Sequence, residues 1–443
     1  MTAPAPPPGA APSPNPIELV RSRSYLALVV LGAAIGVPVS FVAYFFLKFV
    51  AEAQSWVFST LPSDLGLHPV PAWWPLAPLF VSGLLVGLTI EHLHGTAGHR
   101  PAEGFKAAGA VNPLDLPGIV LASLATLCLG AVLGPEAPLI AIGSGLGVLA
   151  VHLVKKDAPP MAALVIGAAG SFAAIATLLG SPIVGAFLLM EAAGLGGPML
   201  GVVLVPGLVA AGIGSLIFLG LDKWTGYGTL SLTIGPIPAF GTPTGAEFAW
   251  AIVIGIAAAL LGSLIRRGAL LAQPVVERRK VVLTPLVGLL VAGLAILFNE
   301  VSGHASSYVL FSGQTQLPAL VQHAAAWSVG TVLLLIVCKG LAYSASLSAF
   351  RGGPIFPGMF IGAALGIAFS HLPGLPLIAG VGIGIGAMTV SMLGLPLVAV
   401  LLPTLLLSAD GIAMMPLVII GVAVAYIATA HLAPPPTAAE VPS

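Results

Sequence analysis

The sequence GPEAPLIAIGSGLG at residues 134–147 returns as GPIFPGMFIGAALG at residues 353–366. Both copies follow the frame G-P-x-x-P-x-x-x-I-G-x-x-L-G and agree at seven of fourteen positions. A second pair follows in the same order, LLGSPIVGAFLL at residues 178–189 and MLGLPLVAVLLP at residues 392–403. Two ordered matches separated by almost half the chain predict an internal duplication.

We expect five segments along the chain. The two repeats are predicted at residues 25–221 and 248–432, joined by a connecting loop at residues 222–247. The Pro/Ala-rich tail at residues 1–24 and the tail at residues 433–443 are expected to be disordered. Duplicated membrane proteins with broken helices at matching positions usually bind their substrate where the repeats meet.

The composition is that of an integral membrane protein. Of the 443 residues, 58% are hydrophobic and only 7% are charged, whereas about 25% of the residues in soluble domains are charged. Long apolar runs such as residues 25–50 suit membrane helices, and their continuity argues against an outer-membrane barrel. The 55 glycines and 40 prolines predict broken helices, because irregular backbone in a bilayer must be buried in protein or line a polar cavity.

Basic residues predict the orientation of the chain. Arg21 and Arg23 precede the first apolar run, whereas residues 51–75 contain no Lys or Arg. Since cytoplasmic loops are enriched in these residues, we expect a multi-pass protein of a plasma membrane, the bacterial inner membrane, with a cytoplasmic N-terminus. Cys128 and Cys338 lie in apolar runs and are interpreted as small hydrophobic residues, so no metal or cofactor is expected.

Glu136 is an ionisable residue between two prolines in an otherwise apolar segment. A Gly-Pro pair before an apolar run is typical of a helix start, where free N–H groups and the helix dipole attract anions. Two such starts, one from each repeat, could bind a small anion without a full positive charge. Glu136 could occupy that site itself and close the path until protonation or a permeant ion displaces it. The alternative is a structural role, in which Glu136 only caps its own helix.

These motifs resemble those of the CLC family of chloride channels and chloride/proton exchangers. GPEAP at residues 134–138 is similar to the family's gating motif G-[KR]-E-G-P, and residues 352–366 are similar to its G-x-F-x-P helix start. GSPIVGAFLLMEAAG at residues 180–194 resembles its APLAGxLFxxE segment. The resemblance implies an all-α, inverted-repeat bundle of tilted and broken transmembrane helices. It also implies a homodimer with one pore per subunit.

The resemblance further implies which residues bind the anion. It makes Glu136 the gate and assigns the anion to backbone groups at or near Thr96, Ala97, Gly98, Gly134, Pro135, Ala137, Ile355 and Phe356. The family's serine-containing loop G-S-G-I-P corresponds only loosely to GTAGHRP, where Ala97 stands at the serine position. Pro354 replaces a backbone donor, and the pore tyrosine has no counterpart, because Tyr426 falls in the preceding helix. The anion is therefore expected to rest mainly on backbone dipoles.

Two neighbouring positions bear on proton coupling. Glu191 matches a glutamate that channels and exchangers of the family share, and we interpret it as mainly structural. Ala192 follows it, at the position where many exchangers carry the glutamate that relays protons. This loss favours passive movement of chloride over proton-coupled exchange. A chloride/proton antiporter with an atypical proton path stays open as an alternative.

Other functions fit parts of the sequence. The chain could be a secondary transporter of another small anion such as fluoride or nitrate. An intramembrane hydrolase using Ser144 and His304 is disfavoured, because the counterpart of Ser144 in the repeated frame is Ala363. Lys339 and Arg351 could draw anions toward the pore, reach an interface or pair with a carboxylate. We expect a transporter rather than an enzyme, with a small anion, the lipid bilayer and a second copy of the chain as partners, and no nucleic acid.

Overall fold

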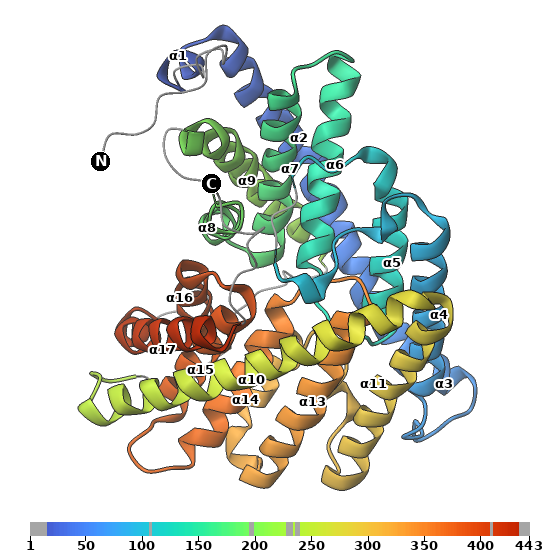
Figure 1. Cartoon of the computed structure of the whole chain (residues 1–443), viewed down its shortest axis with the longest axis vertical. Coiled ribbons are helices and arrows are strands. Elements are labelled where there is room, and N and C mark those ends of the chain that lie inside the picture. Colours follow the sequence, from blue (N-terminus) through green and yellow to red (C-terminus); the bar gives the residue numbers. More distant parts are fainter. Residues whose placement is uncertain are drawn as a thin grey trace.

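The computed structural model describes residues 16–105, 109–194, 199–226, 234, 240–407 and 411–433. Over these ranges the protein is a bundle of helices, and the only extended pairing is one isolated bridge between two residues. Figure 1 shows the helices of the first half, from blue to green, mainly in the upper part of the view. Those of the second half, from yellow to red, occupy the lower part.

Within the described ranges, each half contributes seven main helices in the same order. Those of the first half are α2 (Arg23–Ser55), α4 (Leu76–His92), α5 (Leu116–Cys128), α6 (Glu136–Val154), α7 (Pro160–Leu179), α8 (Pro182–Ala192) and α9 (Met199–Thr225). Those of the second are α10 (Gly245–Arg278), α11 (Lys280–Ser302), α13 (Val329–Ala349), α14 (Ile355–Ser370), α15 (Leu377–Leu393), α16 (Pro396–Leu406) and α17 (Gly411–Leu432). The shorter helices are α1 (Pro16–Val20), α3 (Leu61–Asp64) and α12 (Leu317–Gln322).

Many of these helices are too short to cross a bilayer on their own. Eight helical segments in the described part of the chain are long and apolar enough to span it. Six further apolar helices, among them α5, α8 and α14, have only 10–17 residues, fewer than the roughly 20 that a full crossing needs. Proline stands in the first turn of α8 and α16, where its missing N–H costs no hydrogen bond. The expectation of an all-α integral membrane protein with broken helices is confirmed.

The helix ends differ slightly from the predicted segment bounds. α1 and the first residues of α2 fall inside the tail predicted at residues 1–24, because Ser22 accepts a backbone N–H from the first turn of α2 and so starts that helix earlier. α9 continues to Thr225 and α10 begins at Gly245. Residues 1–15 and 434–443 of the predicted tails, and part of the connecting loop, lie outside the described residues.

The two halves are arranged as inverted repeats. α4 and α11 occupy the same place in the two halves and pack antiparallel, since Gly83 of α4 lies against Pro285 and Gly87 lies against Lys280. The helix pairs inside each half also correspond: α6 packs on α7 as α14 packs on α15, and α2 packs on α9 as α10 packs on α17. The expected inverted repeat is confirmed.

One contact joins the two halves at equivalent residues. Gly134 and Gly353 open the two copies of the repeated motif, and the N–H of each donates to the carbonyl oxygen of the other, at 2.7 and 2.6 Å. An antiparallel pair of equivalent residues that exchange both hydrogen bonds has local two-fold symmetry. The bridge therefore lies on the local axis between the repeats, and α6 and α14 both begin next to it.

Candidate anion-binding site

The starts of α6 and α14 meet at the bridge between Gly134 and Gly353. Each helix begins two residues after its bridge glycine, and a proline in right-handed conformation precedes each helix. The first N–H groups of a helix have no acceptor within the helix, so these starts direct backbone donors and positive dipole ends toward the bridge. The structure thereby brings together four of the predicted anion-binding positions: Gly134, Pro135, Ile355 and Phe356.

Glu136, the predicted gate, is completely buried at this point. Its Oε1 accepts the backbone N–H of Phe356, in the first turn of α14, at 2.9 Å. Its Oε2 has no hydrogen-bond partner among the described residues. The carboxylate therefore bonds to the helix start of the other repeat, which a cap restricted to its own helix would not do.

The two bridge glycines leave room for this carboxylate. A Cβ added to Gly353 would lie 1.7 Å from Glu136 Oε2, and a Cβ added to Gly134 would lie 2.3 Å from the same atom. Real Cβ atoms do not approach an oxygen so closely, so any larger residue at either position competes with the carboxylate for space. Glycine at both positions thus leaves room for the Glu136 side chain and also lets the two backbones form the bridge.

The loop before α5 is the third part of the site. Gly95, Thr96, Ala97 and Gly98 have φ angles of 76°, 50°, 60° and 91°. Left-handed backbone is unusual for Thr and Ala, and such strain persists only where neighbouring contacts enforce it. One of those contacts is the hydrogen bond from Arg351 Nε to the Thr96 carbonyl oxygen at 3.4 Å.

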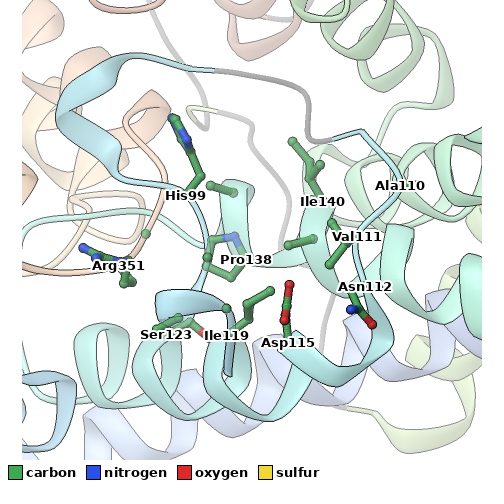
Figure 2. A pocket seen from close by; sticks show the side chains of 16 residues that line it. His99, Ala110, Val111, Asn112, Asp115, Ile119, Ser123, Pro138, Ile140 and Arg351 are labelled. Atoms are coloured by element: carbon green, nitrogen blue, oxygen red, sulfur yellow. The ribbon is translucent and has the colours of Figure 1, made fainter. Parts of the chain in front are cut away.

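A cavity of about 350 Å³ lies between this loop and the start of α6. Ala97, Gly98 and Ala137, three of the predicted positions, line it together with Arg351 and Gly352. Figure 2 shows Pro138 of α6 between Arg351 on one side of the cavity and Asp115 and Asn112 on the other. Thr96 is the exception among the predicted positions, because it lines a separate cavity of about 270 Å³, which Arg351 also borders.

The sequence profile of the voltage-gated chloride channel family matches residues 83–430. The chain belongs to the CLC family. YfeO of Escherichia fergusonii, whose name provisionally describes an ion-transport protein, is 28% identical over 361 residues, or 80% of this chain and 82% of that protein. YfeO of Escherichia coli strain SMS-3-5 shows the same identity and coverage.

Solved structures show the same fold. The crystal structure of a slow cyanobacterial Cl⁻/H⁺ antiporter matches with a TM-score of 0.73 at 18% identity, covering 92% of this chain and 95% of that one. A CLC-type fluoride/proton antiporter matches with a TM-score of 0.64 at 20% identity, covering 91% and 95%. At these identities, the likeness establishes the CLC fold.

Glu191 lies away from the bridge, at the contact between α8 and α16. Its two carboxylate oxygens accept the backbone N–H groups of Leu397 and Val398 at 2.8 and 2.9 Å. These are free donors at the start of α16, so the carboxylate caps a helix of the other repeat. Ala192, beside it, is half-buried and brings no titratable group to this CLC protein.

Two polar residues near the site have roles that the motifs did not reveal. Tyr343 of α13 is buried and donates from its hydroxyl to the carbonyl oxygen of Pro354, at 2.7 Å. Arg351 follows α13 and borders both cavities. Tyr343 sits in an apolar helix whose sequence offers no signal for this contact. The position of Arg351 two residues before Gly353 was the available signal for its place beside the site.

The residues of the disfavoured hydrolase make separate contacts. Ser144 donates from its hydroxyl to the carbonyl oxygen of Gly109, whereas the His304 ring lies 4.0 Å from the Trp327 ring. None of the described contacts of these two residues joins one to the other. In the described part of the chain, no group of three or more His, Cys, Asp or Glu side chains is placed to hold a metal ion.

Proposed function

We propose that the protein carries chloride, or a similarly small anion, across the membrane where α6 and α14 meet, with Glu136 as the gate. The observation that carries the proposal is the hydrogen bond from the Phe356 N–H to Glu136 Oε1. Through this bond the carboxylate of one repeat occupies a backbone donor at the helix start of the other repeat. A permeant anion needs the same donor, so the carboxylate and the anion compete for it.

Backbone donors suit a site that must both bind and release an ion. Within the described ranges, none of the ion pairs involves Glu136. The positive ends of two helices attract an anion with partial charges only. A site of this kind holds the ion more weakly than a fixed cation beside it would, and conduction requires such release.

Cavities on opposite sides of the gate support a path through it. One is the cavity that reaches Ala137 beside Glu136. Another, of about 310 Å³, is lined by Trp74, Asn299 and Phe311, near the start of α4 and the end of α11. The first cavity is instead lined by Gly95, in the loop that follows the end of α4. The N–H of Phe311 donates to the carbonyl oxygen of Gly130 at 3.2 Å, so this second cavity approaches the segment that leads to the bridge.

We further propose that the movement is passive rather than proton-coupled. Ala192 supplies no proton relay, and both carboxylate oxygens of Glu191 are engaged at the start of α16. Glu136 alone would then respond to protons, because its protonation removes the charge that competes with the anion. Acidification is expected to open the gate without exporting a proton for each anion moved.

Chloride efflux from proteoliposomes tests the gate. We expect Glu136→Ala and Glu136→Gln to conduct at all pH values, whereas wild-type efflux rises as the pH falls. Simultaneous recording of external pH separates passive flow from chloride/proton exchange. Chloride efflux without proton movement supports a passive path, and stoichiometric movement of protons with the chloride contradicts it. Folded wild-type and variant proteins that all fail to move chloride would contradict the gate and the chloride assignment together.

A further inference from the structure

Arg351 is a buried cation beside the proposed path. Only 7% of its surface is exposed, and it lies on the segment between α13 and α14. Its backbone N–H donates to Thr126 Oγ1 at 3.3 Å, which holds this segment against α5. The backbone of the residue is therefore anchored independently of its side chain.

The guanidinium group has few partners. Nε donates to the Thr96 carbonyl oxygen at 3.4 Å, and Nη1 donates to the Phe350 carbonyl oxygen at 3.2 Å. A guanidinium carries five N–H donors, and Nη2 has no acceptor among the described residues. None of the ion pairs in the described ranges includes Arg351. Glu277 and Glu103 stabilise its charge from a distance and Arg100 opposes it, but no carboxylate makes the direct pair that buried arginines usually have.

The cavity supplies the space for a missing partner. Arg351 borders the cavity of about 350 Å³ that also reaches Ala97 and Ala137. Figure 2 shows its side chain on one side of this cavity, away from Asp115, the carboxylate on the other side. That carboxylate is engaged by His94. Among the described residues, the ionisable side chains that line the cavity are thus Arg351, with unused donors, His99, whose Nε2 bonds to the Gly104 carbonyl oxygen, and Asp115, which already has a partner.

We propose that Arg351 binds a small inorganic anion, such as chloride, in this cavity as a station on the way to the Glu136 gate. The station deepens the proposed function, since it supplies an anion site along the same path. A charged donor here replaces the side-chain ligand that is absent at Ala97. Because Arg351 stands in a wide cavity and not at the bridge itself, it raises the local anion concentration without blocking passage.

Calorimetric titration of the detergent-purified full chain with bromide tests the station. Charge-assisted hydrogen bonds account for roughly tenfold or more in affinity, so Arg351→Met is expected to raise the bromide Kd at least about tenfold. Arg278→Met is the matched control, since Arg278 is an exposed arginine at the end of α10, and its Kd should equal that of the wild type. Arg351→Lys keeps the charge without the planar group and should give an intermediate Kd.

Chloride efflux separates binding from simple damage to the fold. Loss of the station should raise the half-saturating chloride concentration while the maximal rate is kept, whereas a damaged fold lowers the maximal rate. If Arg351→Met does not fold, Arg351→Lys carries the test. An unchanged Kd in the folded variants overturns the station but leaves the gate intact, whereas a wild-type protein that neither binds bromide nor moves chloride overturns the proposed function and the station with it.

Discussion

Glu136 fits its position because the two bridge glycines, against which its carboxylate lies, have no side chains. Gly134 and Gly353 exchange two backbone hydrogen bonds, and the carboxylate lies where a Cβ of either residue would be. Its Oε1 has one donor, the N–H of Phe356, and its Oε2 has none among the described residues. A buried carboxylate with one unsatisfied oxygen carries a desolvation cost, which favours its movement out of this place, as a gate requires.

Gly353→Ala tests this fit without changing the carboxylate. The new Cβ would lie 1.7 Å from Glu136 Oε2 and 3.0 Å from Glu136 Cβ, so the flexible side chain must move away. We expect chloride efflux from proteoliposomes to approach that of Glu136→Ala, with a weaker dependence on pH. Gly293→Ala in α11 is the matched control, since nothing lies within 4 Å of its added Cβ. Efflux of folded Gly353→Ala at the wild-type rate or below it would argue against the gate.

The sequence predicted Glu136 and the glycines around it, because both proline frames are local patterns. It left the role of Arg351 open between drawing anions toward the pore, reaching an interface and pairing with a carboxylate. Tyr343 was missed altogether, although its hydroxyl supports the start of α14. Such contacts join segments that no spacing rule connects, so only the folded chain reveals them.

Among the elements, α13 carries a second buried cation with a different surrounding. Lys339 is fully buried, and its Nζ lies 3.0–3.3 Å from the four carbonyl oxygens of residues 308–311, which share its three N–H donors. It also lies 4.5 Å from the centre of the Phe360 ring in α14. Lys339 therefore neither reaches an interface nor pairs with a carboxylate. It ties a loop to two helices.

Lys339→Met should accordingly destabilise the protein. The substitution leaves several buried carbonyl oxygens without a donor, and we expect a loss of about 3 kcal/mol or more in unfolding free energy. Thermal unfolding in detergent, followed by tryptophan fluorescence, measures the change. Lys223→Met, at an exposed lysine of α9, should unfold like the wild type. Equal stability of the two variants would show that the contacts of Nζ with these carbonyl oxygens contribute little.

At the element scale, the starts of helices could be predicted, but the side chains that cap those starts could not. Gly-Pro pairs marked the beginnings of α6 and α14, since proline fits the first turn. Glu191 was interpreted as mainly structural, but the sequence did not say which element it serves. Its oxygens reach the start of α16 in the other repeat, a contact that depends on how the halves pack.

For the molecule as a whole, the duplication was visible in the sequence and its inversion was not. An offset between motifs says nothing of direction, and the CLC resemblance supplied that expectation. Antiparallel packing of α4 on α11 and the bridge between equivalent glycines show the inversion directly. The homodimer stays a prediction, which the mass of the purified protein in detergent can check.

The orientation in the membrane also stays a prediction, and single cysteines can test it. In a variant without Cys128 and Cys338, we expect Asp64→Cys to react with a membrane-impermeant maleimide in intact cells. Lys156→Cys should react only after the cells are permeabilised, because the basic clusters are expected in the cytoplasm. Asp64 and Lys156 are both exposed. The reverse labelling pattern would invert the predicted topology.

The most direct test of the account is the position of bromide in a crystal structure of Glu136→Ala. If the carboxylate occupies an anion site, its removal should let bromide bind within hydrogen-bonding distance of the Phe356 N–H, beside Gly134 and Gly353. The wild-type crystal should show no bromide there under the same conditions. Anomalous density at that point only in the variant is the predicted result. A well-ordered Glu136→Ala structure with bromide elsewhere, or the same density in both proteins, would contradict the proposed gate.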